Sequence, residues 1–212
     1  MNHRLHNIAA VFFCLILLAG CASDESKLAS FMDEAQGFYD TAEYEKAVIQ
    51  IKNVLQIKPA HEPALSLLVE TYLKQGNGQD AFKTLLRLEQ INPENIDYKM
   101  QLASFFLLGK KKAEAQKRVA QILEKEPDNI KALYLKTGVM TLDREDINLV
   151  ADEYKKILTL DPQQARAHQA LARIFAVQNK LDQTEAHLIK AVEIEPEKIA
   201  HASALHRFYM SR

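Results

Sequence analysis

Histidine and cysteine have the most versatile side-chain chemistry in this sequence, and their spacing decides whether they act together. Beyond residue 20 they are Cys21, His61, His168, His187, His201 and His206. No histidine lies in a His-Glu-x-x-His motif, and there is no zinc-site spacing, Gly-x-Ser-x-Gly motif or phosphate-binding glycine loop. We interpret the histidines as exposed or partly buried helix residues. We therefore expect a protein that is not an enzyme, with no metal, no cofactor and no small-molecule substrate.

The charge balance excludes a generally basic, nucleic-acid-binding protein. The 212 residues include 27 basic and 28 acidic side chains, for a net charge of −1. A basic cluster at Gly109–Lys112, Lys117 and Arg118 is interpreted as a solvated turn, and the alternative is a contact with lipid headgroups or an acidic partner. The Gly-Asn-Gly at residues 76–78 predicts a turn between two helices.

The apolar stretch Ile8–Leu18 leads into the sequence Leu-Ala-Gly-Cys, which ends at Cys21. This stretch is shorter than the roughly 20 residues of a membrane-spanning helix and has the length of a secretory signal region. Leu-Ala-Gly-Cys resembles the lipobox of bacterial lipoproteins. The resemblance implies a signal peptide at residues 1–20, a lipid anchor on Cys21 and, because Ala22 is not aspartate, the outer membrane. The alternatives are an ordinary signal peptide with a chance cysteine and a retained membrane helix.

Proline marks an internal repeat. Five prolines lie at positions 59, 93, 127, 162 and 196, at intervals of 34, 34, 35 and 34, and each ends an apolar segment with helical spacing. Large residues and alanines recur with the same period, so the sequence predicts stacked helix pairs in which the large residues fill the wedge between pairs. The extra residue of the fourth repeat is expected in the turn Leu142–Asp146, because a turn absorbs it without rotating a helix. The series are Pro59, Pro93, Pro127, Pro162 and Pro196; Phe38, Tyr72, Phe106, Met140 and Phe175; and Ala47, Ala81 and Ala115.

A helix–turn–helix repeat of this length and pattern resembles the tetratricopeptide repeat. The resemblance implies an all-α fold, a right-handed α-solenoid of five repeats over residues 28–198. A short tether over residues 21–27 precedes the repeats, and a C-terminal helix over residues 199–212 either caps the array or begins a sixth repeat. The five repeats are Leu28–His61, Glu62–Asn95, Ile96–Asn129, Ile130–Gln164 and Ala165–Lys198.

In tetratricopeptide proteins the first helices of the repeats line a groove, which implies a peptide or helix of a protein partner as the ligand. The family's lysine–asparagine–arginine clamp for a C-terminal carboxylate is absent, because its places hold Met32, Gln36 and Ser66. We expect a semi-apolar groove that becomes basic at Arg166 and Arg173, and the alternative is a face that is only solvated. The implied groove residues are Met32, Gln36, Tyr39, Ser66, Glu70, Leu73, Met100, Ser104, Leu107, Tyr134, Thr141, Arg166, Gln169 and Arg173.

The segment at residues 43–73, together with Leu-Ala-Gly-Cys, resembles the N-terminal part of the tetratricopeptide lipoproteins of the PEP-CTERM/exosortase system. This resemblance implies a membrane-anchored scaffold of the bacterial envelope, on the outer membrane facing the periplasm, that takes part in exopolysaccharide or surface-protein export. The alternative is a pilotin-like tetratricopeptide lipoprotein that assists type IV pilus or secretin assembly. An enzyme with a helical-repeat lobe would need a catalytic domain after residue 212.

Overall fold

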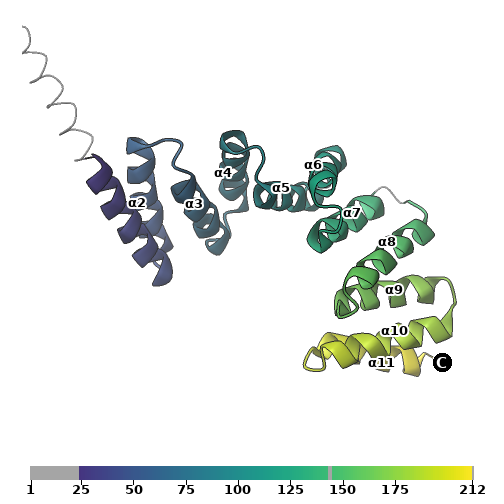
Figure 1. Cartoon of the computed structure of the whole chain (residues 1–212). Helices are drawn as coiled ribbons and strands as arrows, with labels where there is room; N and C mark the ends of the chain where they lie inside the picture. Colours follow the sequence, from purple (N-terminus) through teal and green to yellow (C-terminus); the bar gives the residue numbers. More distant parts are fainter. Residues whose placement is uncertain (1–23, 143–144, 212) are drawn as a thin grey trace, which may run out of the picture. The chain divides into compact units, whose positions relative to one another are not determined.

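The computed structural model describes residues 24–142 and 145–211, and every element in these two ranges is a helix (Figure 1). The all-α fold predicted from the sequence is therefore confirmed. The described part of the first helix covers residues 24–40. The others are α2 (Tyr44–Ile57), α3 (Glu62–Lys74), α4 (Gly78–Ile91), α5 (Ile96–Leu108), α6 (Lys112–Lys125), α7 (Ile130–Leu142), α8 (Ile147–Leu160), α9 (Ala165–Val177), α10 (Leu181–Ile194) and α11 (Ile199–Met210).

The helix bounds follow the period of the sequence. First helices begin at residues 62, 96, 130, 165 and 199, and second helices begin at residues 44, 78, 112, 147 and 181. Both series advance by the same intervals as the prolines, including the single longer one, so the helix pairs fall where the proline series predicts them. The α-solenoid architecture of stacked helix pairs is thus confirmed. Residues 24–27, which the sequence places in the tether, are helical.

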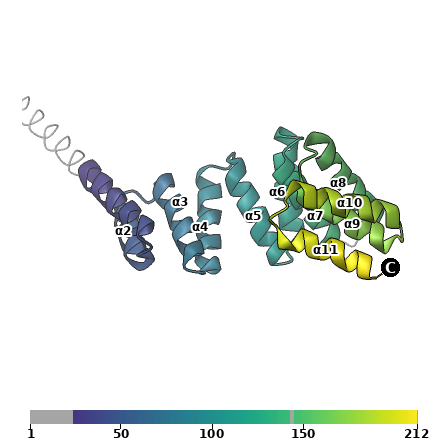
Figure 2. The same ribbon diagram turned by 90° about the horizontal axis from the view of Figure 1, so that it is seen from below.

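The chain forms two compact units. Unit 1 is Met1–Tyr98, of which the described part holds the first helix, α2, α3, α4 and the beginning of α5. Unit 2 is Lys99–Arg212 and holds the rest of α5 and α6 to α11, with α9, α10 and α11 side by side (Figures 1 and 2). None of the helices in the described ranges combines the length and the apolar character needed to cross a membrane.

One backbone hydrogen bond recurs in the turn from the first to the second helix of repeats one, two, three and five. Its donor is the N–H of the residue that precedes the second helix, and its acceptor is the carbonyl of the large residue of the repeat, as in the Schellman motif. The residue before the donor has a positive φ, which satisfies the last carbonyls of the first helix without lengthening the turn. The bonds join Glu43 to Phe38, Asn77 to Tyr72, Lys111 to Phe106 and Lys180 to Phe175, and the positive-φ residues are Ala42, Gly76, Lys110 and Asn179.

The fourth repeat keeps this bond and adds its extra residue afterwards. The N–H of Glu145 donates to the carbonyl of Met140 at 3.2 Å, so the register holds as far as Glu145. Helix α8 then begins at Ile147, two residues later, whereas α4 begins one residue after Asn77. Asp146 is therefore the extra residue, and its carboxylate accepts the N–H of Asn148 at 2.8 Å and caps α8. The insertion predicted within Leu142–Asp146 is confirmed.

The small and the large residues of the repeats are packed inside the fold, as the sequence predicts. The alanines on facing helices are buried, which lets the two helices of a pair approach closely. The large residues are buried or half-buried, with Met140 at 7% and Phe175 at 6% exposure, so none of them points into water. In unit 1 the core contains Ile51, Val54 and Leu68, and half-buried side chains of the first helix pack against it.

Candidate partner-binding faces of the first helices

The predicted groove residues of unit 1 lie on two first helices, residues 24–40 and α3. Gln36, Glu70 and Leu73 are exposed, and Leu73 leaves 47% of its surface in contact with water. Tyr39 and Glu70 are brought together: burial raises the pKa of the Tyr39 phenol, and the nearby Glu70 carboxylate raises it further. We call the exposed side of the first helices the first-helix face.

Two other predicted residues of unit 1 are partly buried. Met32 packs against the unit 1 core, and Ser66 contacts a neighbouring repeat. The Ser66 and Tyr98 hydroxyls are 3.1 Å apart, and the Tyr98 hydroxyl donates to Glu62 at 2.8 Å. These contacts tie consecutive first helices together, so Ser66 has a structural role besides any contact with a ligand.

In unit 2 the predicted residues Ser104, Thr141, Arg166 and Arg173 are exposed, whereas Met100, Leu107 and Gln169 are partly buried. The Leu107 side chain fills the space beside Gly138, where an added Cβ would lie 3.1 Å from a Leu107 methyl. Glycine at residue 138 therefore leaves room for the Leu107 side chain, which covers that part of the face.

Tyr134, also predicted to line the groove, is buried, with 9% of its surface exposed. Its hydroxyl donates to Gln164 at 3.2 Å, and the Arg166 guanidinium lies 4.5 Å from its ring centroid. Burial raises the pKa of the Tyr134 phenol, and the Arg166 charge opposes this shift. A ligand would therefore meet Arg166 before the tyrosine ring.

A hollow of about 360 Å³ opens on the first-helix face between α7, α8 and α9. Val150, Tyr154 and Ile174 form an apolar floor, and Arg173 and Thr141 stand at its edge. A second hollow of about 390 Å³ lies between α9, α10 and α11, with Leu188 and Phe208 in its lining and both Arg173 and Arg207 beside it. The first hollow thus combines an apolar surface with Arg173 and the Glu145 carboxylate, and the second combines an apolar surface with two arginines.

The two hollows are the same site in successive repeats. Residues Ala170, Arg173, Ile174, Val150 and Tyr154 of the first hollow correspond, one repeat later, to Ala204, Arg207, Phe208, Thr184 and Leu188 of the second. Sequence reasoning missed Arg207, although its place in the repeat, the same as that of Arg173, was a usable signal. Arg173 and Arg207 are both exposed, and neither makes an ion pair within the described ranges.

The first helices of the two units differ in charge. Residues 24–40 carry five acidic residues and one lysine, and α3 adds Glu62 and Glu70 against Lys74. Helices α7, α9 and α11 contain no aspartate or glutamate between their first and last residues. Their basic residues are Lys131, Lys136, Arg166, Arg173 and Arg207.

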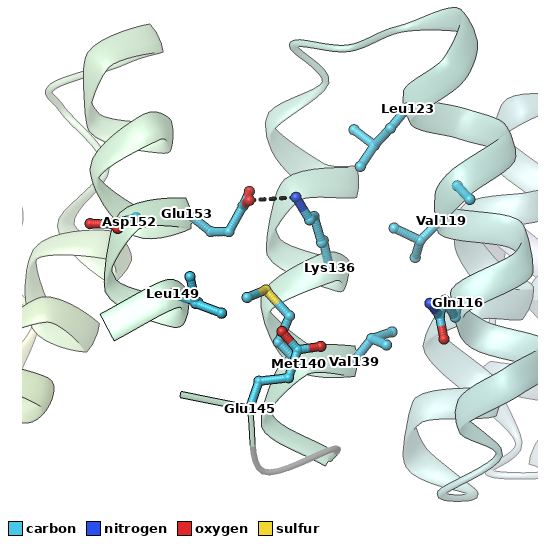
Figure 3. A pocket seen from close by; sticks show the side chains of 11 residues that line it. Gln116, Val119, Leu123, Lys136, Val139, Met140, Glu145, Leu149, Asp152 and Glu153 are labelled. Atoms are coloured by element: carbon cyan, nitrogen blue, oxygen red, sulfur yellow. Dashed lines mark hydrogen bonds and ion pairs between the residues drawn. The ribbon is translucent and has the colours of Figure 1, made fainter. Parts of the chain in front are cut away.

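A separate crevice of about 410 Å³ lies on the second-helix side of unit 2, between α6, α7 and α8. Figure 3 shows Val119 and Leu123 on one wall, Met140 and Val139 on the floor, and Leu149 on the other wall. An ion pair between Lys136 and Glu153 crosses its upper end (Figure 3). Sequence reasoning assigned no site here.

Three histidines are arranged more specifically than the sequence indicates. The Nδ1 atoms of His168 and His187 are 2.8 Å apart, and burial lowers the pKa of both imidazoles. His201 of α11 is 2% exposed, not exposed or partly buried as expected, and its Nε2 lies 2.8 Å from the carboxylate of Glu195, the residue after α10. In the described residues no three histidine, cysteine or acidic side chains converge as metal ligands. Cys21 lies outside the described residues.

Comparison with known proteins agrees with this geometry. Residues 38–104 match the family model described as tetratricopeptide repeat. A tetratricopeptide protein from Parabacteroides merdae superposes with a TM-score of 0.74 over 87% of this chain and 73% of its own, at 17% identity. The chain has the tetratricopeptide fold. No curated protein matches the sequence significantly.

Other solved structures cover most of the chain at low identity. MamA from Desulfovibrio magneticus has a TM-score of 0.69 and 17% identity, over 81% of this chain and 97% of its own. YrrB, a tetratricopeptide protein with an unusual peptide-binding site, has a TM-score of 0.63 and 15% identity, over 82% of this chain and 89% of its own. The tetratricopeptide fold is typically a non-catalytic scaffold for protein–protein interaction.

Proposed function

We propose that this chain is a scaffold that binds an acidic polypeptide segment on the first-helix face of unit 2. The observation that carries the proposal is the repeated hollow, in which an apolar floor and an unpaired arginine recur in successive repeats, at Arg173 and Arg207. Such a hollow suits a segment in which apolar side chains alternate with carboxylates, because apolar contact and charge are then both satisfied.

The absence of acidic residues from α7, α9 and α11 supports the same ligand chemistry. A carboxylate that approaches this face meets no like charge on these helices, and it is favoured most at the second hollow, because Glu145 lines the first. A basic segment would lack these contacts. The peptide-binding site of YrrB is a precedent for peptide recognition by this fold.

The test is fluorescence anisotropy with the full chain and a labelled peptide of repeated Glu-Leu. We expect binding that is lost when glutamine replaces each glutamate, and that weakens when Arg173→Ala and Arg207→Ala are combined. The control variant combines Lys58→Ala and Lys74→Ala, which removes the same charge from exposed positions of unit 1. Equal affinity for the Glu-Leu and Gln-Leu peptides would refute the proposal.

We further propose that the scaffold is anchored to the bacterial envelope through lipid on Cys21 and lies on the outer membrane, facing the periplasm. The Leu-Ala-Gly-Cys step after an apolar stretch and the alanine at residue 22 support this location. Replacement of Cys21 by serine should release the protein from the membrane fraction of cells. A Cys21→Ser variant that stays in membranes would contradict the lipid anchor.

The resemblance of residues 43–73 to PEP-CTERM/exosortase lipoproteins supports a role in exopolysaccharide or surface export. The alternative role is pilotin-like assistance to pilus or secretin assembly. Crosslinking in intact membranes, followed by mass spectrometry, separates the two, because the first predicts export components and the second predicts a secretin subunit.

A further inference from the structure

The crevice between α6, α7 and α8 arises where repeat four departs from the residue pattern of its neighbours. At the seventh place of the first helix, repeats three and five have Leu102 and Leu171, which are fully buried. Repeat four has Lys136 at this place, with 41% of its side chain exposed. A core leucine has thus been replaced by a cation that reaches toward solvent.

The large residue of repeat four also differs. Phe106 and Phe175 stack on a side chain of their own second helix: the Arg118 guanidinium lies 4.5 Å from the Phe106 centroid, and the His187 ring lies 5.4 Å from the Phe175 ring. In repeat four the ring is replaced by Met140, and the side chain opposite it is Glu153. Methionine has no planar face, so the space beside it is left without a ring.

Repeat one has the first of these two changes, a polar side chain in place of the core leucine, but not the second. It has a polar pair at the places of Lys136 and Glu153, because the Gln50 amide donates to Glu34 at 2.8 Å. It nevertheless keeps an aromatic ring, Phe38, at the place of Met140. The distinguishing feature of the crevice is therefore the missing ring next to a charged pair.

Glu153 supplies an acceptor inside this space. One carboxylate oxygen pairs with Lys136, while the other, Oε2, is buried and has no hydrogen-bond partner in the described part of the chain. A buried carboxylate oxygen is stabilised by a donor, so a ligand that brings an O–H or N–H into the crevice gains a charge-assisted hydrogen bond. Figure 3 shows Glu153 above the apolar walls of Leu149 and Met140.

We infer that this crevice binds an aromatic side chain of a partner polypeptide, a tyrosine or tryptophan, which occupies the space of the missing ring and donates a hydrogen bond to Glu153. The volume of about 410 Å³ is sufficient, since a closed apolar cavity of about 150 Å³ already admits benzene. Glu145 and Asp152 at the edge favour a lysine or arginine next to the aromatic residue. The inference does not depend on the acidic ligand proposed for the first-helix face.

The first experiment uses methyl NMR of the full chain labelled at methionine methyl groups, with p-cresol as the probe. A ring bound in the crevice should shift the Met140 methyl signal through its ring current and leave the Met100 signal unchanged. Toluene has the same ring without the hydroxyl, so we expect p-cresol to bind about tenfold more tightly. No Met140 shift, or equal shifts at Met140 and Met100, would overturn the site, and equal affinities would overturn the hydrogen bond to Glu153.

Two variants locate the probe. Ala120→Leu places a larger side chain at an exposed position of the crevice wall and should abolish the Met140 shift without unfolding the chain. Met140→Phe supplies the missing ring, so the melting temperature should rise while saturation transfer to p-cresol is lost. Undiminished p-cresol binding in a folded Ala120→Leu variant would place the probe elsewhere and contradict the inference.

A second experiment tests the partner's chemistry with two capped dipeptides, Lys-Tyr and Glu-Tyr. The acidic edge of the crevice predicts a larger Met140 shift and a tighter complex with Lys-Tyr. No preference, or a preference for Glu-Tyr, would contradict the expected basic neighbour of the aromatic residue.

Discussion

In unit 1 the ninth place of the repeat holds Gln36 and then Glu70, whereas in unit 2 the last two such places hold Arg173 and Arg207. All four side chains are exposed, and the helices that carry them keep the same period and the same buried positions. The fold therefore constrains the inward-facing positions of these helices. The ninth place of each repeat is exposed and can carry a side chain of either charge. We conclude that the two units share an architecture but present different chemistry to a partner.

The strongest test of the two-unit description is a substitution that truncates a buried side chain in one unit only. Leu171 of unit 2 is fully buried, so Leu171→Ala should lower the free energy of unfolding by about 2–5 kcal/mol. Hydrogen exchange should then accelerate at amides of α9 and α10 and stay nearly unchanged in α3. Equal acceleration in α3 would mean that the units unfold together.

Reversing the charges of Arg173 and Arg207 places acidic side chains on the first-helix face of unit 2, as in unit 1. Combining Arg173→Glu with Arg207→Glu should weaken binding of the Glu-Leu peptide by about 30-fold, or about 2 kcal/mol, because two favourable pairs become repulsive. The matched control is Lys58→Glu with Lys74→Glu in unit 1, which changes the net charge equally. If the control loses as much affinity in anisotropy measurements, the binding reflects total charge and not these hollows.

Acid should destabilise unit 2 through the His168–His187 pair. Burial lowers the pKa of both imidazoles in the folded chain, so the unfolded chain takes up protons first as the pH falls. The contribution of the pair is complete above the ordinary histidine pKa of about 6.5 and is lost as the pH falls through it toward the lower folded pKa values.

Urea midpoints measured across this range should fall with acid, and the His187→Gln variant should show a shallower dependence. His61 in unit 1 also has a pKa lowered by burial, which makes His61→Gln the matched comparison. A steeper effect of His61→Gln than of His187→Gln would assign the acid sensitivity to unit 1.

The smallest expected effect concerns the turns. Ala42 in unit 1 and Lys110 in unit 2 have φ values of 59° and 54°, a region in which glycine avoids the strain of a Cβ. Ala42→Gly and Lys110→Gly should each stabilise the chain by about 0.5–1 kcal/mol, and Gly76→Ala should destabilise it by a similar amount. Thermal unfolding measures all three, and a loss of stability in both glycine variants would contradict the strain argument.

The repeat architecture could be predicted because three separate residue series share one period. Proline ends each second helix, alanine allows close approach, and a large residue fills the wedge, so each series independently marks the same helix pairs. Even the extra residue could be assigned to a turn, because an insertion within α7 or α8 would have rotated its apolar face.

The surface chemistry was less predictable. Tyr134 occupies a groove place by register, but it packs under Arg166, and its hydroxyl reaches Gln164, the residue just before α9. Arg207 was missed because α11 was considered for its apolar stripe and not for its place in the register. The pairing of Lys136 with Glu153 joins residues of two helices, and the sequence alone gives no distance between them.

The turn before α8 shows how this architecture tolerates added chain. The closing hydrogen bond from Glu145 is complete before Asp146, and Asp146 then starts a new cap, so the two neighbouring helices keep their own registers. An affinity tag or a fluorescent reporter inserted between Glu145 and Asp146 would extend a turn that is already one residue longer than its counterparts. Both neighbouring helices should therefore fold around the insert.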